Sequence, residues 1–177
     1  MNGGDLAKMD NQTLVFKPRP STGWLWVGGL GLFIGGIGLF PVLLGPVPLL
    51  AVLPSLLICG GLGLAALALA AWFPTMRYEL DGETLTLRYG PILRYRIPLE
   101  QIKGMRRRNL SISLWSSMRL PGLALFTVPY SDVGRVKMCA TAAATRILLI
   151  ETDGGLYGVT PAEEERFVAA VQERLGS

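Results

Sequence analysis

The longest hydrophobic pattern in the chain is an apolar stretch without charge. From Pro20 to Met76, a run of 57 residues, there is no Lys, Arg, Asp or Glu. About 20 apolar residues are enough to cross a bilayer as a helix, so this stretch has room for two crossings. The sequence GPVP interrupts it with residues that end helices. We predict a transmembrane hairpin over residues 23–73, with helices at about 23–44 and 49–73 and a turn at 45–48.

Small residues recur at helical spacing in both predicted helices. Gly31 and Gly35 form a GxxxG pair in the first helix, and Gly61 with Ala65 repeats the spacing in the second. Small side chains let two helix backbones approach closely in lipid. We expect these four positions to pack the hairpin on itself, and dimerisation through the same faces is the alternative.

After the apolar stretch, charge returns and short runs alternate between apolar and polar positions. Such alternation predicts strands, and the Asp-Gly steps at Asp81 and Asp153 predict two hairpins. We expect seven or eight strands; outside the hairpins they fall at about 92–102, 109–115, 123–128 and 134–141. Residues 1–22, ahead of the apolar stretch, are polar and mixed in charge, which predicts a poorly ordered tail.

The last segment has the period of an amphipathic helix. Phe167, Val168, Val171 and Leu175 fall on one face. Thr160 with Pro161 and Glu163 has the pattern of a capping box, so we expect Thr160 to be the N-cap. The predicted fold class is therefore α+β with a membrane part, in which residues 76–177 form a bent antiparallel sheet or barrel closed by the C-terminal helix.

Charge predicts the orientation of the hairpin. Lys17 and Arg19 precede the first helix, Arg77 follows the second, and the turn between the helices is uncharged. Positive residues near membrane ends stay in the cytoplasm, so both termini are expected there. We predict a multi-pass membrane protein with cytoplasmic N- and C-termini.

The sequence KGMRRR, residues 103–108, is the densest basic cluster. We interpret it as a loop that either is solvated or contacts anionic lipid headgroups, where each basic residue contributes about 1 kcal/mol. No zinc pattern, basic helix or aromatic platform accompanies it, so nucleic-acid binding is not expected. A phosphate-handling site lacks its glycine-rich loop. The candidate contact residues are Lys103, Arg106, Arg107 and Arg108, joined by Arg94 and Arg96.

Catalytic chemistry is sparsely represented. The chain contains no histidine, the commonest general base and metal ligand, and it contains two cysteines, Cys59 and Cys139, which we expect to be unpaired. Ser131 and Asp132 with Lys137 could form a nucleophilic site only with a desolvated lysine as base, and we interpret them as an ordinary loop. We predict no enzyme activity, no metal, no cofactor and no small-molecule substrate.

The second half of the chain resembles a known family. The features that carry the resemblance are the LPG turn at 120–122, Gly134 ahead of a strand ending in Ala140-Thr141, the strand–DGG–strand hairpin, and Thr160-Pro161 leading into a helix with an inward Phe167. Together they resemble the bacterial pleckstrin-homology (PH) domains of small membrane proteins, over Met76–Leu175. The resemblance implies a seven-stranded bent sheet capped by the helix.

The functional expectation is a binding module. Eukaryotic phosphoinositide-binding PH domains are basic between their first two strands, whereas the corresponding turn here is the acidic Asp81-Gly82-Glu83. Pleckstrin-like folds serve as lipid, peptide or oligomerisation platforms, so the fold alone does not choose among them. We expect a scaffold for a protein partner or for self-association. The alternatives are lipid binding through 103–108 and an accessory subunit of a larger membrane complex.

Overall fold

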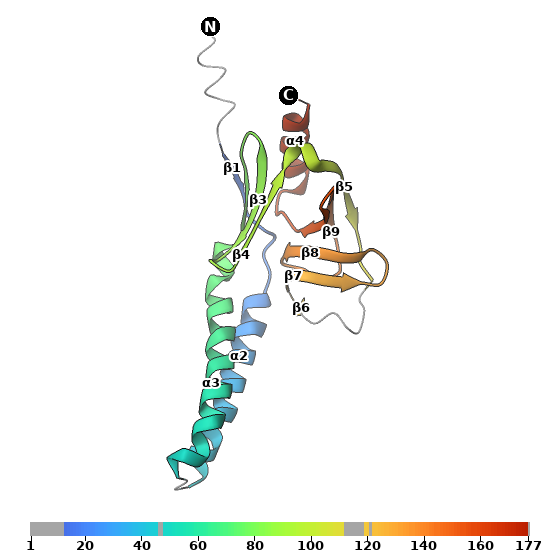
Figure 1. The fold of residues 1–177 in the computed structure, drawn as a ribbon. Helices are drawn as coiled ribbons and strands as arrows, with labels where there is room; N and C mark the ends of the chain where they lie inside the picture. The colour runs from blue at the N-terminus through green and yellow to red at the C-terminus, as the bar shows by residue number, and fades with distance from the viewer. Residues whose placement is uncertain (1–12, 46–47, 112–118, 121, 177) are drawn as a thin grey trace. The chain divides into compact units, whose positions relative to one another are not determined.

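The computed structural model describes residues 13–45, 48–111, 119–120 and 122–176. They form two compact units (Figure 1), an all-helical unit over Thr22–Pro74 and a sheet-rich unit made of the residues on both sides of it. The helical unit is thus an insertion in the sheet-rich one, because the sheet-rich unit draws on residues up to Ser21 and from Thr75 onward.

The helical unit is a pair of long apolar helices. Helix α2 spans Gly23–Leu44 and helix α3 spans Leu49–Trp72, followed by the short 3-10 helix η1 at Phe73–Thr75. Both long helices have the length and composition to cross a membrane. Large apolar side chains such as Phe33, Leu43 and Leu64 are two-thirds or more exposed. A helix that is hydrophobic all round suits a lipid environment.

Glycines bring the two helices together. A Cβ atom added at Gly63 would lie 2.8 Å from the carbonyl oxygen of Gly31 and 3.1 Å from the Cα of Gly35. Gly61 has open space where a Cβ would be, and Ala65 is exposed. The expectation that Gly61 and Ala65 pack the hairpin on itself is therefore wrong. The spacing of small residues does not reveal which face of a helix meets its neighbour; their dimerisation role stays a prediction.

We expect Gly63→Leu to weaken the α2–α3 contact by about 1–3 kcal/mol, because the new side chain meets backbone atoms that cannot move aside. Gly61→Leu makes the same chemical change on the open face, and its expected effect is within about 0.5 kcal/mol. Titration of both variants with a denaturing detergent, followed by circular dichroism of the helices, measures the difference. Equal unfolding of the two variants would contradict this packing.

The sheet-rich unit contains two sheets (Figure 1). The first is antiparallel, with the order β1 (Leu14–Phe16), β2 (Arg77–Leu80), β3 (Thr84–Tyr89), β4 (Leu93–Pro98). The 3-10 helix η2 (Leu99–Gln101) leads to the second sheet, and helix α4 (Glu164–Leu175) ends the domain. The order of the second sheet is β5 (Ile102–Arg108), β9 (Ile147–Thr152), β10 (Gly155–Val159), β8 (Gly134–Ala140), β7 (Leu123–Tyr130), β6 (Arg119–Leu120).

This architecture confirms the predicted α+β class, with apolar helices ahead of a sheet-rich domain and a C-terminal helix. Both predicted hairpins are present, as β2–β3 and β9–β10. The described strands outnumber the expected seven or eight, and β10 pairs with β8 in parallel, so the sheet is not purely antiparallel. The strand expected at 109–115 lies largely outside the described residues, and 109–111 are not in a strand.

The described part of the N-terminal segment, residues 13–22, belongs to the fold, which corrects its interpretation as a poorly ordered tail; residues 1–12 lie outside the described residues. Strand β1 pairs with β2, with Phe16 opposite Tyr78, and the Phe16 side chain is only 7% exposed. Pro18 bridges to Pro161 beyond it. Three apolar residues are too few to predict a strand alone. The segment is ordered because it pairs with the edge of β2, which lies some 60 residues later in the sequence.

Aromatic rings join the first sheet to α4. The Phe167 ring is fully buried and meets the rings of Phe16 and Tyr78 edge-on, at centroid distances of 5.2 and 6.1 Å. The Tyr78 hydroxyl donates a hydrogen bond to the carbonyl oxygen of Cys139 (2.8 Å) and accepts one from the amide of Thr160 (3.2 Å). A buried hydroxyl with both partners is tolerated in an apolar core.

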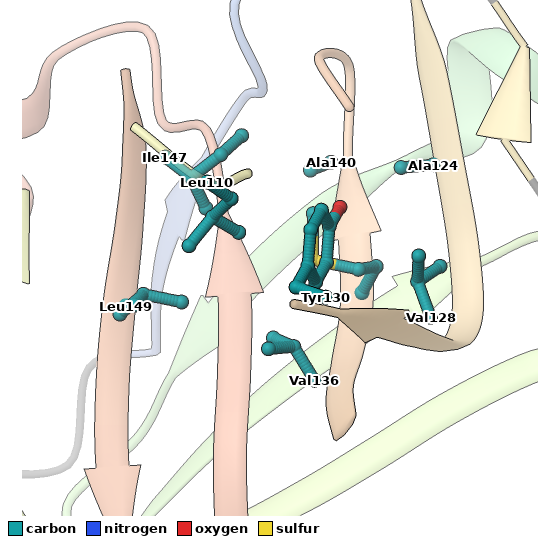
Figure 2. Packing of buried hydrophobic residues seen from close by; sticks show 9 residues of the cluster. Leu110, Ala124, Val128, Tyr130, Val136, Ala140, Ile147 and Leu149 are labelled. Carbon is teal, nitrogen blue, oxygen red and sulfur yellow. The ribbon is translucent and has the colours of Figure 1, made fainter. Parts of the chain in front are cut away.

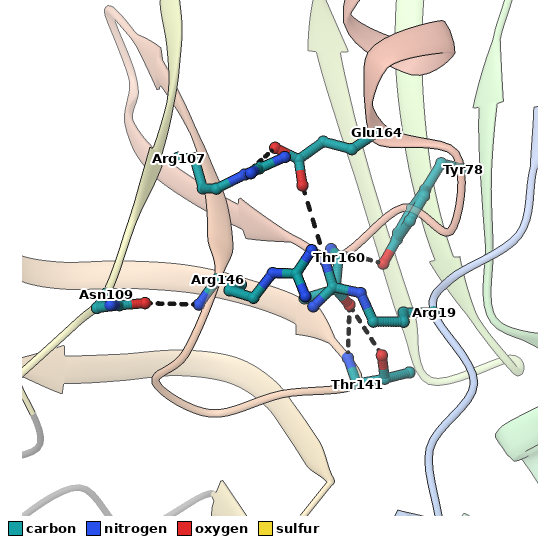
Figure 3. Close-up of polar contacts among 8 residues, drawn as sticks. All are labelled: Arg19, Tyr78, Arg107, Asn109, Thr141, Arg146, Thr160 and Glu164. Atoms are coloured by element: carbon teal, nitrogen blue, oxygen red, sulfur yellow. Dashed lines mark hydrogen bonds and ion pairs between the residues drawn. The ribbon is translucent and has the colours of Figure 1, made fainter.

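Thr160 belongs to this core and is not the N-cap of α4. It is completely buried, and its Oγ1 accepts a hydrogen bond from the amide of Thr141, as Figure 3 shows. Helix α4 begins at Glu164, after Glu163. The expected capping box is therefore wrong, because the Thr160 hydroxyl is hydrogen-bonded to Thr141 and does not cap the helix.

A second apolar cluster lies within the six-stranded sheet (Figure 2). Tyr130 is part of it and donates its hydroxyl hydrogen to the carbonyl oxygen of Ala143. Inward side chains from three strands and one loop form the cluster, among them Leu110, Val128, Val136, Ile147 and Leu149.

Stability should fall at alkaline pH. Burial raises the pKa of the Cys139 thiol from 9.0 to about 12. Between these values the unfolded chain releases a proton that the folded chain retains, so the free energy of unfolding falls as pH rises above 9, by up to about 1.4 kcal/mol per pH unit. Unfolding curves from pH 8 to 11 test this. Cys139→Ala should flatten the dependence, and an unchanged slope in that variant would contradict the assignment.

Candidate functional site

The basic cluster at 103–108 is a strand and not the loop that the sequence predicts. These residues belong to β5, which lies at one edge of the six-stranded sheet and pairs with β9. Their side chains lie next to acidic residues of β9, of α4 and of two loops. These partners come from distant parts of the sequence. The positive charge of residues 103–108 is therefore unbalanced in the linear sequence and balanced in the fold.

Every basic side chain predicted on this segment has a carboxylate partner. Lys103 Nζ lies 2.5 Å from Asp153 Oδ1 and Arg107 Nε lies 2.7 Å from Glu164 Oε1, and Asp153 raises the pKa of Lys103 by hydrogen bonding. The remaining pairs are Arg106 with Glu151 and Arg108 with Asp132. Four cations meet four anions, so β5 offers little net charge to an anionic surface.

Arg94 and Arg96 lie elsewhere, on β4 of the four-stranded sheet. Both are exposed, and neither has an ion pair with a described residue. The six predicted contact residues are therefore divided between two sheets, and no described contact joins the two groups.

The outer surface of the four-stranded sheet collects unbalanced positive charge. The strand register places Arg77, Arg88 and Arg94 opposite one another across β2, β3 and β4. The next outward row contains Glu79, Thr86 and Arg96. The inward positions on these strands are apolar and buried, so the arginines point to solvent. We name the surface made by Arg77, Arg88, Arg94, Arg96 and Glu79 the arginine face.

Glu79 is the single acid of the arginine face. Its Oε1 accepts a bond from Arg77 Nε at 2.6 Å and lies 3.5 Å from Arg88 Nη1. The arginine face thus has four guanidinium groups and one carboxylate, which pairs with two of them. Like charges directly opposite one another destabilise a sheet, and an external anion on this face would relieve that repulsion.

The residues considered for catalysis do not converge. Asp132 accepts a hydrogen bond from the amide of Ser111 and pairs with Arg108. Lys137 instead contacts Tyr157, with its Nζ 4.8 Å from the ring centroid. Ser131 Oγ donates to the carbonyl oxygen of Ser111. In the described part of the chain, no three His, Cys, Asp or Glu side chains cluster as metal ligands would.

Sequence reasoning missed Arg77 and Arg88 as site residues. The signal was present, because RYEL, TLTLRY and LRYR alternate arginine with apolar side chains. The alignment of these arginines depends on the register of β2, β3 and β4. The Asp81-Gly82 turn fixes the register of β2 with β3, whereas we identified no such turn from the sequence for β3 with β4.

One of three comparisons with known proteins gives a match. The model of the family described as Bacterial PH domain matches residues 76–175. No curated protein and no solved structure matches the chain. The matched segment contains β2 to β10 and all of α4, whereas β1, α2 and α3 precede it. Because this match covers more than half of the sequence, and the fold beneath it is the expected sheet capped by a helix, the chain belongs to the bacterial PH domain family.

Proposed function

We propose that this chain is a membrane-anchored, non-catalytic binding module whose arginine face binds anionic lipid headgroups. The arginine face supports this proposal, because it gathers four arginines and one acid, Glu79, across three paired strands of the described domain. Arg77 follows the last residue of α3 by only a few positions, so the face is tethered near the bilayer.

In this proposal α2 and α3 cross the bacterial inner membrane and both chain termini are cytoplasmic. Lys17, Arg19 and Arg77 flank the helices, in agreement with the distribution of positive residues on the cytoplasmic side. The pairing of β1 with β2 adds a second argument. The chain enters the helices from one strand of this pair and returns into the other, so both helix ends belong on the same side as the domain.

The expected binding strength is moderate. Each basic residue near an anionic leaflet contributes about 1 kcal/mol, so four arginines offset by Glu79 give about 3 kcal/mol. The two helices already hold the domain near the lipid, which makes the contact intramolecular in effect and raises its occupancy. The attraction decays over about 8 Å at physiological ionic strength. Docking is therefore reversible and sensitive to salt.

A fluorescent label at Val15 tests the proposal. Val15 is 57% exposed and lies opposite Glu79 on the outer surface of the sheet. We would introduce Val15→Cys together with Cys59→Ser, since Cys139 is buried. In nanodiscs that contain anionic lipid, access of a water-soluble quencher to the label should fall relative to neutral discs, and high salt should restore it.

Arg94→Gln with Arg96→Gln should reduce the docking equilibrium constant about thirtyfold, which corresponds to two charges at about 1 kcal/mol each. Arg106→Gln with Arg108→Gln removes the same charge from β5, where the arginines are already paired, and should have a much smaller effect. Equal quenching in neutral and anionic discs, or equal loss in the two double variants, would rule out docking through this face.

A protein partner is the second candidate, and the edge strand β4 favours it. Among described residues β4 pairs only with β3, so its other edge can receive an extended segment. Tyr95 on this strand is half-buried and meets Tyr157 edge-on at 5.6 Å. Tyrosine and arginine are the residues that carry most binding energy at interfaces. Tyr95→Ala should abolish partner capture by the full chain while leaving lipid docking intact.

A further inference from the structure

A cavity of about 440 Å³ opens beside the start of α4, away from the residues of the arginine face. Its volume falls within the range of small-molecule sites. It brings together residues of the N-terminal segment, of β5, of the loop before β9 and of α4. Its lining residues include Arg19, Arg107, Arg146, Glu163, Glu164 and Arg166.

Backbone contacts fix the three arginines that line the inner part of the cavity. The amide of Arg19 donates to the carbonyl oxygen of Thr160 at 2.7 Å, which ties the N-terminal segment to the core. Arg107 is held by the pairing of β5 with β9. Arg146 has a φ of 52°, in the left-handed region that non-glycine residues rarely adopt. Its amide donates to Asn109 Oδ1 at 2.8 Å, which helps hold that conformation (Figure 3).

Two of the three guanidinium groups share one carboxylate, that of Glu164. Arg107 Nε donates to Glu164 Oε1 at 2.7 Å, and Arg19 Nη2 lies 3.7 Å from Glu164 Oε2. Glu163 forms an ion pair with Arg166, with 2.9 Å between Glu163 Oε2 and Arg166 Nη1. Within the described part of the chain, the Arg146 side chain has no ion pair, and Figure 3 shows it extending toward Arg19. Counting all lining residues, four arginines face three glutamates.

We propose that this cavity binds the phosphate group of a small soluble molecule, with Glu164 as an internal carboxylate that the phosphate replaces. Arg146 supplies the charge that Glu164 leaves unbalanced, and Arg19 and Arg107 supply donors already directed at an oxyanion. Guanidinium groups match phosphate oxygens in pairs. A phosphate group carries close to two negative charges at neutral pH, against one for the carboxylate that it displaces. The site is distinct from the arginine face and does not depend on lipid docking.

Two substitutions with opposite expected signs make the proposal testable. Arg146→Gln should weaken phosphate binding about tenfold, because a cation without an internal partner is lost. Glu164→Gln should strengthen binding about tenfold, because the competing charge is removed. An ion network with only a structural role predicts no phosphate binding in any variant. Arg135→Gln is the matched control, since Arg135 is exposed on β8 outside the cavity.

The experiment is isothermal titration of pyrophosphate into the full chain in nanodiscs of neutral phosphatidylcholine. Binding by the wild type and by Arg135→Gln, weaker binding by Arg146→Gln and tighter binding by Glu164→Gln would support the proposal. Absence of binding heat in the wild type, Arg146→Gln equal to the wild type, or Glu164→Gln no tighter than the wild type would each overturn it.

A second arm identifies the source of the phosphate. Phosphatidic acid is added to the discs, and competition with pyrophosphate is measured in Arg146→Gln and in Arg94→Gln with Arg96→Gln. No competition supports a soluble ligand. Competition that only Arg146→Gln removes would show that a lipid headgroup enters the cavity, and would overturn the assignment to a soluble ligand. Loss of pyrophosphate binding in the Arg94 and Arg96 variant would move the site to the arginine face and overturn the proposal.

Discussion

Phe167→Ala is expected to lower the free energy of unfolding of the sheet-rich unit by about 3–5 kcal/mol. The Phe167 ring is fully buried and lies between the rings of Phe16 and Tyr78. Its removal leaves a cavity where β1, β2 and α4 meet, and those elements come from three distant parts of the sequence. They cannot all move inward to fill the space, because hydrogen bonds fix Tyr78 to Cys139 and Thr160.

Thermal unfolding of the full chain in micelles, followed by the near-ultraviolet dichroism of the tyrosines, measures this loss. A change of 1 kcal/mol shifts the Tm of a domain of this size by about 4–8 °C, so the variant should melt far below the wild type. Leu175→Ala on the same helix is the control, because Leu175 is 41% exposed, and its effect should be much smaller. Equal shifts for the two variants would show that α4 does not pack through Phe167.

Local patterns in the sequence predict the elements of this fold well. The Asp81-Gly82 turn is fixed by its own residues, because Asp81 Oδ1 accepts hydrogen bonds from both the amide and the hydroxyl of Thr84. The period of α4 identifies Phe167 and Val171 as buried. Such signals act over a few residues and survive without tertiary context. Thr160 shows the limit, since its local pattern predicts a cap and its buried contact with Thr141 overrides it.

The candidate sites were less predictable because they depend on distant partners. Arg107 appears free in the sequence, and its partner Glu164 lies on another element. The arginine run suggests an unbalanced basic surface for this reason, although each of its basic side chains has a carboxylate partner in the fold. Arg77 and Arg88 stand singly in the sequence, and only the strand register aligns them with Arg94. The net charge of a surface depends on which residues the fold brings together. The number of arginines in a short stretch of sequence therefore predicts it poorly.

The N-terminal segment offers the clearest test of an element that the sequence alone does not reveal. Phe16→Ala should lower the free energy of unfolding by about 3 kcal/mol, because its ring is buried against Phe167 at 5.2 Å. Val15→Ala, one residue earlier on the outward side, should change it by no more than about 0.5 kcal/mol. A disordered tail would give no effect for either substitution.

A double-mutant cycle separates the contact from general loss of hydrophobicity. If Phe16 and Phe167 stabilise the domain through their mutual packing, the combined variant should lose less than the sum of the single losses, by about 0.5–1.5 kcal/mol for an edge-on aromatic pair. The same melting measurement supplies all four values. Strict additivity would mean that β1 packs independently of α4. The segment that leads into α2 would then be attached to the domain by its strand pairing alone. The proposed placement of both helix ends on one side would rest on that pairing and on the flanking charges.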